Sequence, residues 1–300
     1  MSALQKIFCS DLAREYGLSL IGTATRGDIW FLLEYSGRWG AKALDESALD
    51  PQVIAHLQEA RYPGVESRAL LIKQEHLKTQ EGIRFFIVKT HPQFPELYEY
   101  QLVDYRDLLS INLAALVAGQ PGDPAHLRTE PLYLVCANGK RDQCCSIYGP
   151  EAYQAMQAEA GEAVWQSSHI GGHNRAPTML FFPHGLNYGQ ATPAEARRLV
   201  QAYQQNKVVL HNYRGRVCFD PPAQAAEHFW RQQTGILDLP GLQIEAVAEI
   251  GANQWQVTLR SADGLTSDQI RLQRRVSDYN IPLSCNQQKS APVSTFHRID

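Results

Sequence analysis

Apolar runs of strand length alternate with amphipathic stretches of helical period through the first third of the chain. Residues 29–35 (IWFLLEY) are the most apolar of these runs, and Asp50 followed by Pro51 is a typical start of a helix. This alternation predicts helices packed on a mixed sheet. The expected helices cover residues 11–16, 51–57 and 108–116, and the expected strands cover residues 29–35, 69–72, 83–89 and 97–103.

A segment rich in glycine and proline, residues 119–129 (GQPGDPAHLRT), has no apolar period and is the best linker candidate. After it the pattern restarts with a buried strand at residues 132–136 (LYLVC). A Gly-Pro pair is expected to open a helix over residues 149–161, and residues 163–167 read as the next strand. Because a crossover helix joins these two strands, we expect them to be parallel.

The next stretch predicts a hairpin and the clearest helix start in the chain. Residues 178–182 and 186–188 are expected to pair, and Thr192 can cap a helix in which Glu195 completes a capping box. The resulting order, βαβ followed by ββ and α, is that of a thioredoxin-like domain. Residues 130–206 have the right length for one.

The remaining part predicts a helix at residues 221–234 and an antiparallel meander with strands at 244–250, 255–259 and 270–276. The last twenty residues show little pattern and are expected to form a tail. The fold class predicted is therefore α/β, with a thioredoxin-like domain between an α/β N-terminal domain and a helix with an antiparallel β-meander. The three segments cover residues 1–120, 130–206 and 207–300.

Composition agrees with a globular chain, since 44% of the 300 residues are hydrophobic and 20% are charged. A net charge of −3 and a pI near 6.4 argue against a nucleic-acid binder, which usually shows a basic excess. No apolar run approaches the roughly 20 residues that span a bilayer, and the first residues lack a signal-peptide core. We expect a cytoplasmic protein without nucleic-acid or membrane partners; the sequence is silent on its protein partner and oligomeric state.

Six cysteines are too few for a secreted disulfide scaffold, but their distribution is uneven. In a reducing compartment, a local group suggests metal or redox chemistry, whereas isolated cysteines are usually small buried hydrophobes. The local group is Cys136, Cys144 and Cys145, and the isolated residues, interpreted as core positions, are Cys9, Cys218 and Cys285.

Two thiols and two imidazoles follow neighbouring predicted strands. Cys136 and Cys145 belong to the loop after the first strand, and His169 and His173 (HIGGH) to the loop after the second. Parallel neighbouring strands would bring both loops to the same sheet edge. The glycine pair disfavours a helix there and fits a loop that passes close to an inorganic group. Two cysteines and two histidines also form a common zinc site, although eight residues between the cysteines suit a wider two-iron cluster better.

At this point the chain resembles the sucrase/ferredoxin-like family. The similar stretches are residues 136–149, HIGGHNRAPTMLFFPHGLNYGQATP, CSDLAREYGLSLIGTA and YRGRVCFDPPAQAAEHFWRQQTG, so the resemblance runs from about residue 9 to about residue 235. It implies a metal domain related to thioredoxin-like [2Fe–2S] ferredoxins. The implied cluster ligands are Cys136, Cys145, His169 and His173, with Cys144 as the alternative second thiolate. No carboxylate pair suited to sugar hydrolysis is apparent, and no catalytic residue is assigned.

These ligands predict one-electron transfer by a [2Fe–2S] cluster. Arg141, in the ligand loop, could add positive charge beside it, while His184 is a weaker neighbouring candidate and Pro177 stands where thioredoxin folds place a cis-proline. Two alternatives stay open. One is a structural zinc site in a binding module, and the other is a thiol–disulfide redox protein using the vicinal Cys144-Cys145 pair.

Overall fold

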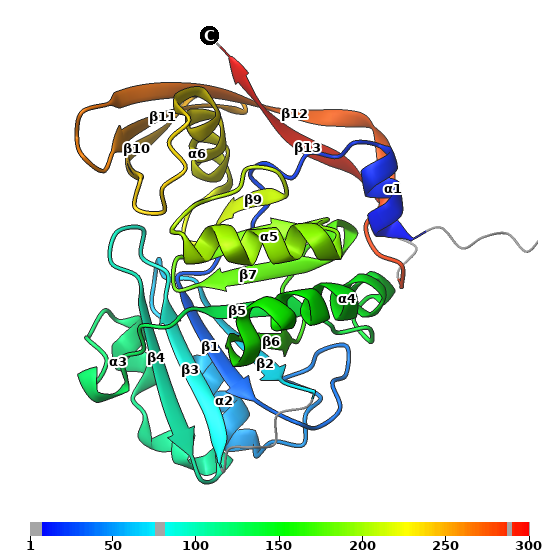
Figure 1. Ribbon diagram of the computed structural model, residues 1–300, viewed down its shortest axis with the longest axis vertical. Coiled ribbons are helices and arrows are strands. Elements are labelled where there is room, and N and C mark those ends of the chain that lie inside the picture. The colour runs from blue at the N-terminus through cyan, green and yellow to red at the C-terminus, as the bar shows by residue number, and fades with distance from the viewer. Residues whose placement is uncertain (1–7, 76–81, 287–289, 300) are drawn as a thin grey trace, which may run out of the picture.

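The computed structural model describes residues 8–75, 82–286 and 290–299 and contains two sheets (Figure 1). The larger sheet has nine strands in the order β4-β3-β1-β2-β6-β5-β7-β8-β9. It is mixed, because β1 pairs with β2 and β5 with β6 in parallel, whereas its other neighbours are antiparallel. Its strands are β1 (Ile29–Glu34), β2 (Ser67–Lys73), β3 (Ile83–Lys89), β4 (Glu96–Leu102), β5 (Leu132–Cys136), β6 (Val164–Ser167), β7 (Thr178–Phe182), β8 (Leu186–Gly189) and β9 (Tyr213–Arg216).

The smaller sheet is antiparallel throughout, and helix α6 (Pro221–Thr234) packs against it through Ala225, Ala226 and Trp230. Its strands are β10 (Leu242–Gly251), β11 (Gln254–Ser261), β12 (Ser267–Pro282) and β13 (Ser290–Ile299). The mixed α/β class is thus confirmed, with a separate antiparallel sheet at the C-terminal side of the chain.

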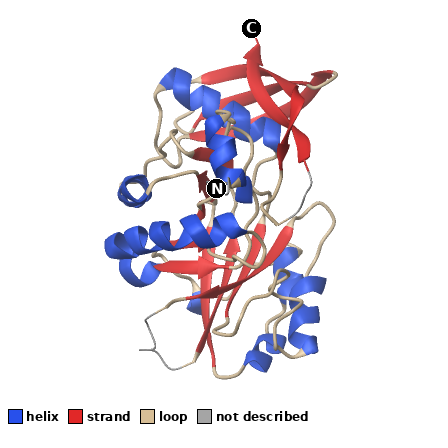
Figure 2. Cartoon of the chain, turned by 90° about the vertical axis from the view of Figure 1, so that its right-hand side faces the viewer, coloured by secondary structure: helices blue, strands red, loops and turns tan. Residues whose placement is uncertain are grey.

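Helices lie on both sides of the larger sheet (Figure 2). The α-helices are α1 (Cys9–Glu15), α2 (Pro51–Glu59), α3 (Leu113–Val117), α4 (Gln143–Ala160), α5 (Pro193–Gln204) and α6 (Pro221–Thr234). The 3₁₀ turns are η1 (Tyr105–Ser110), η2 (Pro124–His126), η3 (Gly161–Ala163) and η4 (His173–Arg175). Within the described part of the chain, no helix combines the length and apolarity needed to cross a bilayer.

Local signals in the sequence place several elements correctly. The Asp50 carboxylate accepts the backbone N–H of Gln52 at the start of α2, and the capping box of Thr192 and Glu195 opens α5. Strands β5 and β6 are parallel and β7–β8 is a hairpin, as expected. The bond before Pro177 is cis.

Helix α4 begins at Gln143, seven residues before Pro150, so the prediction that the Gly-Pro pair opens it is wrong. The Asp142 carboxylate accepts the backbone N–H of Cys144 and provides the earlier cap. Pro150 lies inside the helix. The first turn therefore carries Cys144 and Cys145, which were expected in a loop.

Two further predictions are corrected. The single helix expected over residues 108–116 is divided into η1 and α3, because the backbone is extended at Ile111 and the Asn112 side chain caps a new helix by accepting from Ala115 N–H. The last residues are not a tail, since β13 pairs with β12 and buries Val293 and Phe296. Only these two positions in β13 are buried, which is why its pattern is weak in the sequence.

The sheet continues without interruption from the N-terminal strands to the central ones. Strand β2 pairs with β6 through Ile72 and Ser167, and one apolar core contains side chains from both sides of this junction. Its aromatic contacts include Trp30 against Phe182, with ring centroids 5.6 Å apart. The segment boundaries expected from the sequence remain a prediction, but the strands on either side of residues 119–129 share one core.

Candidate metal centre

Cys136 stands at the end of β5, where it faces the loop that follows β6. The parallel register pairs Cys136 with Ser167, so the polypeptide leaves both strands at the same edge, as the sequence predicts. The Cys136 side chain is 1% exposed and borders the shared core. A buried strand therefore fixes the first sulfur ligand of the predicted site.

Cys145 is brought to Cys136 by the first turn of α4. The two Sγ atoms are 3.4 Å apart, which is a contact between free thiols and not a disulfide. Gly149, one turn later, is needed for this approach, since a Cβ there would lie 2.4 Å from the carbonyl oxygen of Cys136. The missing side chain lets the helix pack directly on the end of the strand.

His169 completes a compact group with these two cysteines. Its Nδ1 atom lies 3.8 Å from Cys136 Sγ and 3.9 Å from Cys145 Sγ. The hydrogen bond between the two thiols lowers the pKa of Cys136 and raises that of Cys145, and the contact with His169 also lowers the pKa of Cys136.

His173 lies beside His169, with ring centroids 5.3 Å apart. Its Nε2 atom contacts the backbone carbonyl oxygen of Leu283 and lies 3.9 Å from Asp142 Oδ2. Within the described residues, the buried Nδ1 atom has no hydrogen-bond partner. Burial lowers the pKa of His173, so the ring is neutral, with Nε2 as the donor and a bare lone pair on Nδ1. Histidine ligands of metals usually show this arrangement, in which the outer nitrogen donates to a carbonyl or a carboxylate.

The two histidines are held by a glycine loop packed on a buried arginine. Gly171 and Gly172 have φ values of +118° and +73°, in the region that favours glycine. A Cβ at Gly172 would lie 2.5 Å from the guanidinium of Arg214, which donates to the carbonyl oxygens of Gly171 and Thr23. Burial lowers the pKa of Arg214, and the negative charge of Cys136 opposes this shift. No motif in the sequence signals this buried cation.

We call Cys136, Cys145, His169 and His173 the Cys–His site. Donor atoms of Cys136, Cys145 and His169 lie within 4.8 Å of one another. His173 is not part of this group but lies beside it, through the contact of its ring with that of His169. Within the part of the chain that the structure describes, the buried Nδ1 of His173 accepts no hydrogen bond, so its lone pair is available to a metal. These cysteine and histidine side chains could therefore bind a metal.

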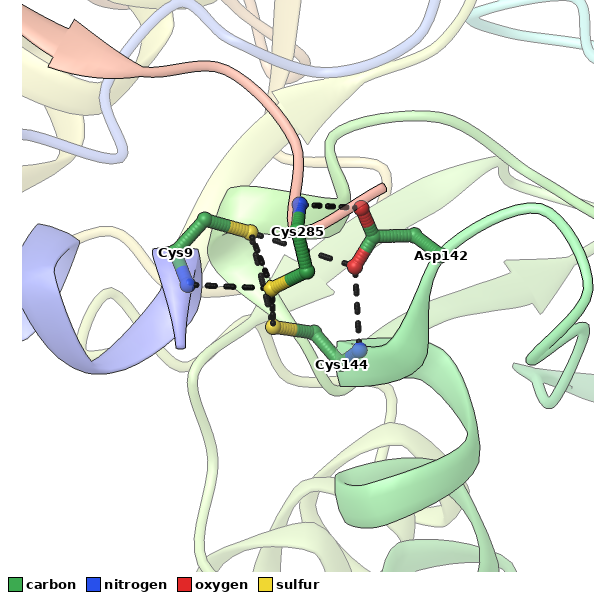
Figure 3. A group of neighbouring side chains, drawn as sticks. All are labelled: Cys9, Asp142, Cys144 and Cys285. Atoms are coloured by element: carbon green, nitrogen blue, oxygen red, sulfur yellow. Dashed lines mark hydrogen bonds between the residues drawn. The ribbon is translucent and has the colours of Figure 1, made fainter. Parts of the chain in front are cut away.

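The vicinal cysteines face different partners. Cys145 contacts Cys136, whereas the Sγ atom of Cys144 lies 3.4 Å from that of Cys9 and 3.3 Å from that of Cys285 (Figure 3). Cys9 is a buried core residue, as predicted, and Cys285 packs against the same small core, but neither is isolated, because both contact Cys144. Sequence spacing gives no sign of the group, because these contacts join residues 135 and 141 positions apart. Cys218 is separate from both groups and borders the core beneath the smaller sheet.

Two weaker candidates have different positions. Arg141 is exposed, its charge lowers the pKa of His173, and it lines a surface cleft together with His169. His184 contacts the Tyr203 hydroxyl at 2.7 Å and not the Cys–His site. Arg141 is thus a neighbour of the ligands, whereas His184 belongs to the core between β7 and α5.

Comparison with known proteins agrees with this geometry. The model of the sucrase/ferredoxin-like family matches residues 20–215, which contain all four members of the Cys–His site. The chain belongs to this family. Most of the larger sheet lies inside the matched region, and the smaller sheet lies outside it.

Curated relatives match over a shorter part of the chain. The proteins named altered inheritance of mitochondria protein 32 are 33% identical over 103 residues in Eremothecium gossypii and 30% identical over 100 residues in Meyerozyma guilliermondii. These alignments cover 29% and 30% of this chain, and 33% and 36% of the relatives. The similarity thus spans only about a third of each curated protein. No solved structure matches significantly.

Proposed function

We propose that this protein transfers single electrons through a [2Fe–2S] cluster bound by the Cys–His site in a thioredoxin-like ferredoxin domain. The observation that carries the proposal is the bare, buried Nδ1 of His173 beside the contact group of Cys136, Cys145 and His169. When bound, such a cluster exchanges one electron at a potential that imidazole ligands place roughly between −150 and +300 mV, as in Rieske centres.

Two features reduce the negative charge at the Cys–His site. Two neutral imidazoles replace two anions relative to an all-cysteine site, and the buried guanidinium of Arg214 adds a positive charge next to the HIGGH loop. Both features stabilise added negative charge and therefore support a relatively high potential.

Access for a redox partner is available at His169. This residue is half-buried, and the cleft that it lines is also bordered by the basic residues Lys42, Arg61, Arg68 and Arg141. Cys136 and Cys145 are buried, whereas the His173 side chain is 20% exposed. We propose that electrons enter and leave through this cleft; the partner's identity and its location in the cell stay open.

Metal and spectroscopic analysis of protein purified without oxygen tests the proposal. We expect a brown protein with two irons and two sulfides per chain and an electron paramagnetic resonance signal after one-electron reduction. A colourless protein with zinc held by the Cys–His site would support the structural zinc alternative instead. Metal-free protein with a reversible disulfide would support the thiol-redox alternative, although the sulfurs of Cys144 and Cys145 have different nearest partners.

A further inference from the structure

A second group of metal-binding side chains lies next to the Cys–His site. Three sulfur atoms, from Cys9, Cys144 and Cys285, form a triangle with sides of 3.3, 3.4 and 3.4 Å (Figure 3). We call these residues the three-thiol group. They come from the start of α1, the first turn of α4 and the segment between β12 and β13. Three distant parts of the chain therefore meet at one point.

Asp142 provides an oxygen donor on the same site. Its Oδ1 atom lies 3.9 Å from the Sγ atom of Cys9, and one donor atom from each of the four residues lies within 4.8 Å of all the others. The carboxylate is 0% exposed and held firmly, since Oδ1 accepts from Cys144 N–H while Oδ2 accepts from Cys285 N–H and the Ser284 hydroxyl. A pre-oriented carboxylate completes the donor set.

The surroundings of the sulfurs suit bound thiolates. The backbone N–H of Cys9 donates to Cys285 Sγ at 3.2 Å. Cys9 and Cys144 are buried, and Cys285 is half-buried.

We propose that the three-thiol group and Asp142 form a second metal site that binds one Zn²⁺ ion. Sulfur ligands about 2.3 Å from a tetrahedral zinc are about 3.8 Å apart, close to the spacing seen here. Three thiolates select soft or borderline ions, and the fourth, carboxylate donor favours Zn²⁺ over Cu(I). A disulfide would single out one pair of cysteines, whereas the three separations are nearly equal.

The zinc ion would act as a structural link between the chain segments. Residues 283–285 run across the first turn of α4, where Ser284 and Cys285 bind Asp142 while Leu283 contacts His173. A metal bound by Cys285 fixes this segment and, through it, the contact on the outer nitrogen of His173. The proposal does not depend on iron in the Cys–His site, because the two groups share no ligand.

Paired cysteine variants separate the two sites. Metal analysis of protein prepared without oxygen should find one zinc per chain in the wild type. We expect Cys9→Ser and Cys285→Ser to lose zinc, with affinity in a chelator competition lowered more than about tenfold. Cys136→Ser should keep its zinc while losing iron, and Cys218→Ser, a half-buried cysteine outside both groups, should keep both metals.

Cobalt substitution and thiol counting complete the test. Wild-type protein stripped of zinc and titrated with Co²⁺ should develop the absorption of a tetrahedral thiolate complex, which Cys285→Ser should lose. Circular dichroism will show that this variant is folded, and Asp142→Asn offers a second variant that preserves the helix cap. Zinc that persists in both Cys9→Ser and Cys285→Ser, a disulfide within the three-thiol group, or wild-type protein that neither contains nor binds Zn²⁺ would overturn the proposal.

Discussion

His173 presents its Nε2 atom to the backbone carbonyl oxygen of Leu283, a residue 110 positions further along the chain. The carbonyl can only accept, so this contact fixes the tautomer and leaves the lone pair on Nδ1. A segment outside the matched family region thus sets the protonation of a predicted ligand. Such support of a metal-binding imidazole by a second layer of contacts commonly tunes the bound metal.

Replacing both histidines by cysteine tests their role as ligands. The double variant of His169 and His173 should keep a cluster, but two neutral donors become anions, and the potential should fall by a few hundred millivolts toward about −400 mV. Its dependence on pH should flatten, because a bound thiolate has no outer nitrogen to titrate. Protein-film voltammetry between about pH 6 and pH 9 measures both effects. His184→Asn is the control, and an unchanged potential in the double variant would show that the histidines do not bind iron.

Single cysteine variants test which sulfurs bind iron. Cys136→Ser should abolish cluster assembly, and Cys145→Ser should nearly do so, because both sulfurs face His169. Cys144→Ser should retain the iron, since that sulfur faces Cys9 and Cys285. Iron and sulfide content of the three variants gives the answer. If Cys144→Ser alone lost its iron, the second thiolate ligand would be Cys144 and not Cys145.

Gly149→Ala should disturb the Cys–His site without touching a ligand. The new Cβ would lie 2.4 Å from the Cys136 carbonyl oxygen, so α4 has to move away from β5 and take Cys145 with it. We expect reduced iron content and a loss of about 1–3 kcal/mol in stability from overpacking. Gly251→Ala is the matched control, as the nearest atom is a flexible glutamine oxygen at 3.3 Å. Equal iron content in the two variants would argue against this packing constraint.

A buried ion network should dominate the stability of the region around β9 and α6. Glu227 binds Arg216 at 3.1 Å and Arg231 at 3.0 Å, and all three side chains are buried. Glu227→Gln leaves two buried cations without an anion, so the free energy of unfolding should drop by about 3–5 kcal/mol. Asp238→Asn, which removes an exposed pair with Lys207, should cost at most about 1 kcal/mol. Urea denaturation measures the loss of unfolding free energy in both variants. Similar losses in the two would contradict the prediction.

Stability should depend on pH through His184. Burial lowers its pKa to about 4, while the unfolded chain has the ordinary value near 6.5. Between these values the unfolded state binds a proton that the folded state does not, so stability falls as the pH drops below about 6.5, by up to about 3 kcal/mol. Urea denaturation between pH 4 and 7.5 should show this slope in the wild type. The slope of stability against pH should be weaker in His184→Asn. An identical slope in the variant and the wild type would show that other groups cause the pH dependence.

The sequence predicts the elements whose signals are local. The Thr192–Glu195 capping box, the alternating strands and the HIGGH loop all depend on neighbouring residues, and the structure agrees with them. Predictions fail where contacts between residues far apart in the sequence determine the structure. Asp142 starts α4 early, and Cys9 joins Cys285 although 276 residues separate them. Likewise, Arg214 supports the ligand loop from β9, where nothing distinguishes it from an ordinary strand residue.

The three-thiol group also imposes an order on biosynthesis. The ligands of the Cys–His site are all present in the nascent chain once residue 173 has been made, whereas the third sulfur arrives only with Cys285, 141 residues after Cys144. Until then, Cys9 and Cys144 form an incomplete set of thiols beside the Cys–His site. A growing chain that folds from its N-terminal side therefore exposes this pair to stray metals and oxidants before its final partner closes over it.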